Sequence, residues 1–143
     1  MRKLIVIGGG LAGVEAAWQA AQSGVGVTLY EMRPNRMTGA HKTGRLAELV
    51  CSNSLRAASI ENAVGLIKEE MSRLGSLVVE CARASSVPAG GALAVDRDRF
   101  ADLIETRVAA HPLIEIRREE VTRIDPDSVC VVACGPLASE SLA

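Results

Sequence analysis

Aromatic residues are nearly absent from these 143 residues, which contain one Trp, one Tyr and one Phe. A core built from this composition has to use Leu, Ile, Val and Ala instead. No apolar run approaches the length of a membrane span, and an aliphatic segment begins directly after Met1-Arg2-Lys3, with no signal peptide before it. We therefore expect a cytoplasmic protein without a membrane partner.

The sequence also lacks an excess of charge and a cysteine pattern. The net charge is −1, so no global basic field attracts nucleic acid, and contact with RNA would need a local arginine patch or parts outside this chain. Cys51, Cys81, Cys130 and Cys134 form no C-x-x-C pair, and no histidines stand at ligand spacing. We predict neither a metal site nor a disulfide framework.

A glycine-rich turn lies between an expected strand and an expected helix at the start of the chain. The aliphatic run 4–7 suits a buried parallel strand, and residues 14–21 are rich in helix formers. The G-x-G-x-x-G spacing allows a tight turn, close approach of a pyrophosphate and close helix packing, and the helix N-terminus favours an anion. This pattern predicts a dinucleotide site at Gly8, Gly9, Gly10, Leu11, Ala12 and Gly13.

An acidic residue follows the next expected strand, which covers residues 25–30. Glu31 stands 18 residues after Gly13, where the dinucleotide fold places a carboxylate for the ribose hydroxyls. A carboxylate there disfavours a 2′-phosphate, so NADP is not expected at this site. The alternative is a glycine turn that binds nothing, with Glu31 as an ordinary surface acid.

The rest of the chain does not continue as a plain Rossmann unit. A long irregular stretch covers about 32–59, and helices are predicted at about 60–74 and 76–84, followed by a glycine turn and a short strand within 87–95. Asp96 should cap a helix that ends near residue 111, because its side chain can accept from the first turn. Strands are predicted at 113–117, around 120–124 and at 129–133, the last of these a buried one.

This order indicates an α/β fold, a Rossmann-like FAD-binding domain of the two-dinucleotide-binding-domain flavoprotein type, here incomplete. Roughly sixty residues separate the second strand from the next helix–strand unit, which a plain NAD domain would not need. We interpret residues 1–143 as the N-terminal part of such a domain, with an active-site insert at about 32–95. The ending Ala133-Cys134-Gly135 matches the second glycine turn that such flavoproteins place against FAD.

Several segments together resemble one family, the folate- and FAD-dependent tRNA uracil-5-methyltransferases (TrmFO), which are related to the GidA flavoproteins. The glycine turn is generic, whereas the segments around Cys51 and Gly90-Gly91 are specific. One departure is Cys134, where the family usually has Thr. The resemblance covers essentially the whole chain and implies the N-terminal third of such a protein. It rests on residues 8–13, 29–34, 47–56, 62–66, 68–71 and 87–97.

The resemblance implies a methylenetetrahydrofolate-tRNA-(uracil-5-)-methyltransferase. In that reaction 5,10-methylenetetrahydrofolate supplies a one-carbon unit that passes by way of reduced FAD to a T-loop uridine of tRNA, with NAD(P)H as reductant. This chain alone is expected to be inactive. Two alternatives remain open at this point: a generic FAD/NAD(P)H oxidoreductase acting on a small molecule, and an inert FAD-binding fragment.

Cys51 is the candidate catalytic thiol, because it matches a cysteine of the family's active-site region. It lies in the long loop at the ligand end of the sheet, and a helical turn after Ser52-Asn53-Ser54 would lower its pKa. Attack on the uracil ring and proton transfer both remain open. From composition alone, a buried structural cysteine is the alternative.

Other candidates carry weaker signals. Arg33 and Asn53 are expected either to meet the FAD or to be solvated. Val121 should contact the adenine through its backbone, with plain sheet pairing as the alternative, and Gly135 should lie against the flavin. His41 and Lys42 are candidates for folate or phosphate contact, although such residues are more often solvated.

Overall fold

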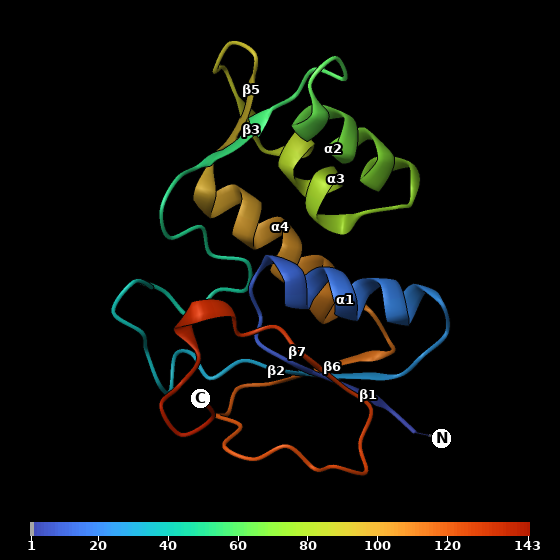
Figure 1. Ribbon diagram of the computed structural model, residues 1–143, viewed down its shortest axis with the longest axis vertical. Coiled ribbons are helices and arrows are strands. Elements are labelled where there is room, and N and C mark those ends of the chain that lie inside the picture. Colours follow the sequence, from blue (N-terminus) through green and yellow to red (C-terminus); the bar gives the residue numbers. More distant parts are fainter. Residues whose placement is uncertain (1) are drawn as a thin grey trace.

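A parallel four-stranded sheet forms one end of the computed structural model, which describes residues 2–143 (Figure 1). Its strand order is β6-β2-β1-β7, and every neighbouring pair is parallel. This is the order of a Rossmann half, in which the first strand lies between the second and a later one. The strands are β1 (Leu4–Ile7), β2 (Val27–Tyr30), β6 (Ile114–Arg117) and β7 (Cys130–Val132).

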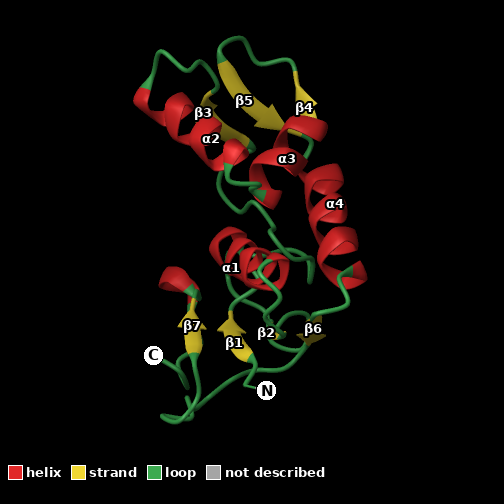
Figure 2. Ribbon diagram, turned by 90° about the vertical axis from the view of Figure 1, so that its right-hand side faces the viewer, coloured by secondary structure: helices red, strands yellow, loops and turns green. Residues whose placement is uncertain are grey.

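Two helices lie on one side of this sheet, as Figures 1 and 2 show. Helix α1 (Leu11–Gln22) connects β1 to β2, and α4 (Arg97–Ala110) leads into β6. The core between helices and sheet is mainly aliphatic, as the composition predicts, and Phe100 and Trp18 are buried within it. The expected N-cap of α4 is confirmed, because Asp96 Oδ1 accepts from the N–H of Arg99 at 3.0 Å.

The segment between β2 and α4 builds a second, smaller unit at the opposite end of the molecule (Figure 2). It contains an antiparallel sheet of order β3-β5-β4 with two helices beside it. The bounds are β3 (Ser54–Ala57), α2 (Ala63–Arg73), α3 (Leu77–Ala84), β4 (Ser86–Val87) and β5 (Ala92–Val95).

A carboxylate on α1, that of Glu15, connects this small unit to the unit that contains the parallel sheet. Glu15 accepts from the hydroxyl of Ser76 at 2.7 Å and from the N–H groups of Leu77 and Val78 at 3.2 and 3.0 Å. These N–H groups open α3, so Glu15 caps a helix that lies more than sixty positions later in the chain. These hydrogen bonds fix the start of α3 directly against α1.

Two expectations for the strands are wrong. Residues 120–124 form no strand, and at their start Glu120 pairs with Arg36. Just before them, Arg118 pairs with Glu105 and donates to the carbonyls of Arg33 and Gly44. β7 is not buried but lies at a sheet edge, with 54% of Val132 exposed.

The structure also places a strand, β3, inside the stretch expected to be irregular. It pairs with β5, almost forty residues later, so local sequence could not reveal it.

The first turn depends on two close approaches. Gly8 has a φ of +105°, which suits glycine, and a Cβ there would lie 2.6 Å from the carbonyl oxygen of Ala133. A Cβ on Gly13 would overlap the carbonyl oxygen of Gly8. No side chain can lie between α1 and the turn, which is what the G-x-G-x-x-G spacing predicts for its third glycine, Gly13.

Gly13→Ala should therefore destabilise the fold by about 1–3 kcal/mol, because the backbone itself must move. Gly39→Ala is the matched control, since no atom lies within 4 Å of a Cβ at that position. Urea denaturation followed by circular dichroism measures both. Equal midpoints for the two variants would contradict the close packing.

Candidate functional site

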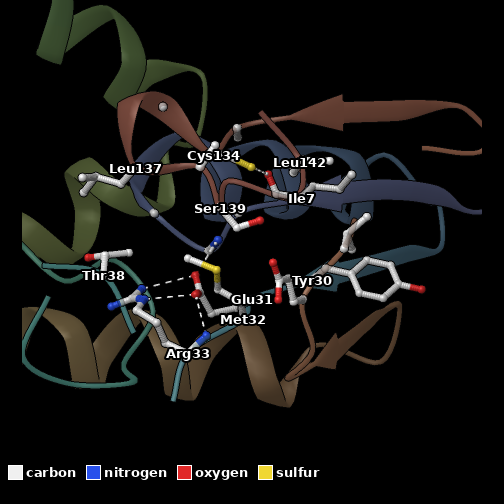
Figure 3. Close-up of a pocket in the computed structure, with 18 of the residues that line it drawn as sticks. Ile7, Tyr30, Glu31, Met32, Arg33, Thr38, Cys134, Leu137, Ser139 and Leu142 are labelled. Atoms are coloured by element: carbon white, nitrogen blue, oxygen red, sulfur yellow. Dashed lines mark hydrogen bonds and ion pairs between the residues drawn. The ribbon is translucent and has the colours of Figure 1, made fainter. Parts of the chain in front are cut away.

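A cavity of about 320 Å³ opens at the carboxyl ends of β1, β2 and β7, next to the N-terminus of α1 (Figure 3). Open α/β sheets bind ligands at this edge. Among the predicted cofactor-binding residues, all but Gly13 line the cavity: Gly8, Gly9, Gly10, Leu11, Ala12, Glu31, Arg33, Val121 and Gly135. Gly13 lies beneath the turn, where it sets the packing of α1.

The glycine turn presents a helix N-terminus to the cavity. Gly10 is the N-cap of α1, no side chain caps the helix, and its first turn contains no acidic residue. A Cβ on Gly10 would meet no atom within 4 Å, so space is open beside the backbone. The N–H groups of the first helical turn have no partner within the helix, and the dipole there favours negative charge. The arrangement suits a phosphate group.

Glu31 stands directly after β2 and is only 6% exposed. Its Oε2 accepts from the N–H of Gly9 at 2.9 Å, and its Oε1 accepts from the N–H and Nε of Arg33 at 2.9 and 3.0 Å. Burial raises the pKa of this carboxyl, but the hydrogen bonds and charge of Arg33 outweigh it and hold the pKa below its ordinary value. Glu31 is thus an ionised acceptor in the cavity wall, not a surface acid.

Arg33 and Asn53 differ from what the sequence suggested. Arg33 is 2% exposed and its guanidinium is paired with Glu31 and Glu48, so the expectation of a solvated side chain is wrong. Asn53 does not line the cavity; its amide donates to the carbonyl of Val95 at 3.0 Å. Asn53 therefore belongs to the small antiparallel unit.

Besides the glycine turn and the residues after β2, the cavity is lined by the segment around Val121 and by the residues after β7. Val121 is in irregular backbone, so the sheet-pairing alternative is wrong for it. Cys134 donates from Sγ to the carbonyl of Ile7 at 3.6 Å, and burial raises the pKa of its thiol. Ser139 is 7% exposed, and its hydroxyl has no hydrogen-bond partner among the described residues. No motif surrounds Ser139, so sequence reasoning could not have found it.

Glu120 lies near this hydroxyl without meeting the distance and angle of a hydrogen bond. The neighbouring Ser139 hydroxyl and Arg36 hold the pKa of Glu120 below its ordinary value. Both Glu120 oxygens accept from Arg36 Nη1 at 3.0 Å, so this carboxylate already has a partner.

His41 also lines the cavity, whereas Lys42 is exposed. The Nδ1 atom of His41 and the hydroxyl of Thr38 are 2.6 Å apart. Burial, and then the charge of Arg33, lower the pKa of His41, which keeps the imidazole neutral at pH 7. Folate or phosphate contact by this pair stays a prediction.

Cys51 lies outside the residues that line the cavity, on the exposed loop before β3. The expected helical turn after it is wrong, because residues 54–57 form β3, and the argument from a helix dipole is lost with it. The alternative of a buried structural cysteine is also wrong. The carbonyl of Cys51 accepts from Arg97 Nη2 at 3.5 Å.

The other cysteines have structural surroundings. Cys81 is 2% exposed in the core, and burial raises the pKa of its thiol to about 11.

Within residues 2–143 no group of three or more His, Cys, Asp or Glu side chains could hold a metal ion. Among the same residues, every helix is too short or too polar to cross a bilayer.

Comparison with known proteins identifies the family. The family model for glucose inhibited division protein A (GidA) matches residues 3–140. The chain belongs to the GidA family. In fold, this GidA-family chain is similar to a solved structure of GidA from Aquifex aeolicus, with a TM-score of 0.67 over 87% of the chain and 18% identity. It is also similar to p-nitrophenol 4-monooxygenase PnpA from Pseudomonas putida, with a TM-score of 0.56 over 89% of the chain and 16% identity. These two chains are covered to 21% and 34%.

Curated relatives of this GidA-family chain are methylenetetrahydrofolate–tRNA-(uracil-5-)-methyltransferases TrmFO. The protein from Pelotomaculum thermopropionicum is 63% identical over 99% of the chain, and that from Citrifermentans bemidjiense is 61% identical over 99%. The protein from Enterococcus faecalis is 57% identical, again over 99%. The chain spans 32–33% of the length of these relatives.

Glu31→Gln tests the buried carboxylate. Because the pKa of Glu31 is lowered in the folded state, its ionised form stabilises the fold above the unfolded-state pKa, and this contribution is lost as pH falls through the folded-state pKa. The variant should be less stable by about 2 kcal/mol at pH 7 and lose less stability than the wild type on acidification. Urea midpoints from pH 7 to pH 3 measure this.

Glu69→Gln serves as the control, since Glu69 makes exposed ion pairs with Arg73 and Arg83. It should change little at pH 7. An identical fall of stability with pH in the wild type and in Glu31→Gln would show that Glu31 is not held ionised by its buried contacts.

Proposed function

We propose that this chain is the dinucleotide-binding part of a methylenetetrahydrofolate-tRNA-(uracil-5-)-methyltransferase. The observation that carries the proposal is its 57–63% identity to proteins of that name over 96–99% of its length. The matched region includes the loop with Cys51 as well as the glycine turn. The full activity belongs to the longer protein, of which this chain spans about one third.

FAD is the proposed occupant of the cavity, and the residues present fit its adenosine diphosphate half. The open space at Gly10 and the N-terminus of α1 suit the pyrophosphate. The ionised Glu31 suits ribose hydroxyls, and the unpartnered hydroxyl of Ser139 offers a further hydrogen bond. Val121 and Gly135, which line the same cavity, are proposed to contact the adenine and the flavin.

When bound, FAD would supply the redox chemistry for moving a one-carbon unit from 5,10-methylenetetrahydrofolate to C5 of a tRNA uracil. The residues of this chain would hold the cofactor at its phosphates and ribose and exclude water from its adenosine end. NAD(P)H is the proposed reductant, and it would bind elsewhere because FAD is the proposed occupant of this cavity. The proposed setting is the cytoplasm, where tRNA is available.

Cys51 is the proposed catalytic thiol, acting either as a nucleophile toward the uracil ring or in proton transfer. Its exposure leaves the sulfur accessible to a large substrate, which a buried cysteine such as Cys81 is not. We assign the stretch at about 32–95 as the insert that carries this thiol. A generic FAD/NAD(P)H oxidoreductase is the competing function, and Cys51 distinguishes the two.

Flavin binding is the first test. Titration of the purified chain with FAD should quench flavin fluorescence, and Gly10→Ala should weaken binding about tenfold or more, because its methyl group occupies the space left for the pyrophosphate. Gly39→Ala should bind like the wild type. A folded chain that binds no FAD would make it an inert fragment.

The thiol is tested in a chimera in which this chain replaces the corresponding third of the Enterococcus faecalis relative. Cys51→Ala should lower tRNA methylation by at least about 10²-fold while FAD stays bound, because nucleophile or proton transfer is lost. Cys130→Ala, on the edge strand, should leave the rate unchanged. Unchanged methylation by Cys51→Ala would remove the proposed role.

A further inference from the structure

The cavity wall contains a buried guanidinium, that of Arg33, with acceptors for four of its five N–H groups. Arg33 Nε donates to Glu31 Oε1 at 3.0 Å, and Nη2 donates to Glu31 Oε2 at 3.2 Å. Nη1 donates to Glu48 Oε2 at 2.8 Å and to the carbonyl of Thr43 at 3.1 Å. A charge 2% exposed is tolerated only when it is paired in this way. Figure 3 shows Arg33 on the far side of Glu31 from Ser139.

Glu48 closes this arrangement into a ring. Its Oε1 accepts from the N–H groups of Lys42 and Thr43 at 3.0 and 3.1 Å, which folds the segment 42–48 back on itself. The N–H of Ala47 then donates to the carbonyl of Gly9 at 2.8 Å, and the N–H of Gly9 donates to Glu31. The glycine turn, Glu31, Arg33 and Glu48 therefore hold one another in place.

The ring also decides which charge faces the ligand. Arg33 directs four of its five N–H groups to Glu31, Glu48 and Thr43, which leaves at most one for a phosphate in the cavity. Two carboxylates, those of Glu31 and Glu48, pair with this one guanidinium, so the group of three carries a net negative charge. The pKa of His41, which also lines the cavity, is lowered by burial and by the charge of Arg33, and Arg118 donates to the carbonyl of Arg33. A free ribose hydroxyl is favoured here, and a 2′-phosphate is repelled.

We propose that Arg33 and Glu48 are positioning residues that hold Glu31 toward the ribose and withhold the guanidinium, so that the cavity selects an adenine dinucleotide with a free 2′-hydroxyl. This inference rests on the proposed function, because it takes the cavity to be the adenosine site. An incoming hydroxyl competes at Glu31 Oε2 with Arg33 Nη2, whose 3.2 Å hydrogen bond is the longest of the four. Glu48 keeps Arg33 engaged during that competition.

The test compares ADP-ribose with 2′-phospho-ADP-ribose by isothermal titration of the chain. The wild type should prefer the unphosphorylated ligand. Glu48→Gln keeps the side-chain shape and an acceptor for Lys42 and Thr43 but loses the charge that pairs with Arg33. It should lower the preference about tenfold, because the freed guanidinium becomes available to the 2′-phosphate.

Arg33→Met should bind ADP-ribose about tenfold more weakly, and Arg33→Lys should recover part of that loss. Glu69→Gln, an exposed carboxylate away from the cavity, should change neither affinity nor preference. The selectivity ratio is the deciding readout, because a purely structural role would weaken both ligands equally.

The outcomes separate the two proposals. A folded wild type that binds neither ligand overturns the proposed function and this inference together. A wild type that prefers ADP-ribose, with the same preference retained in Glu48→Gln, overturns the inference alone. If Arg33→Met fails to fold, Glu48→Gln still decides, since it removes one charge and no side-chain volume.

Discussion

The contact between α1 and the first turn is the constraint on which the site depends. Gly13 brings the helix against the carbonyl of Gly8, and Gly8 in turn approaches Ala133 from the other side. Three segments, the turn, α1 and the residues after β7, thus converge without an intervening side chain. This close packing leaves the N-terminus of α1 facing the cavity. The geometry that suits an anion is therefore a consequence of the packing.

Short-range patterns in the sequence were sufficient for the features that depend on neighbouring residues. The glycine spacing, the acid after the second strand and the Asp96 cap are each set by a few adjacent positions, and the structure has them where expected. What the sequence missed depends on distant partners. Arg33 is buried because it pairs with Glu48, fifteen positions on, and β3 forms because β5 pairs with it. At the irregular segment 120–124, Glu120 pairs with Arg36, 84 positions earlier.

The small antiparallel unit is connected to the nucleotide-type domain by polar contacts at definite points. Glu15 on α1 caps α3 and so joins the two units, whereas the hydrogen bonds that Asn53 exchanges with Val95 lie within the small unit, just before α4. The loop with Cys51 runs between these anchors and the ring of contacts around Arg33. Its two ends are therefore held by hydrogen bonds of Asn53 on one side and of Glu48 on the other, while the thiol itself is left exposed.

The open edge of the parallel sheet has a consequence for handling the chain by itself. β7 pairs with β1 on one side, and its other side carries backbone groups that no strand within residues 2–143 bonds. The exposed Val131 and Val132 make this edge apolar as well. Such an edge is a template on which another strand can add in register. An exposed apolar edge of this kind favours self-association at high protein concentration, and a charged residue at position 132 would counter it.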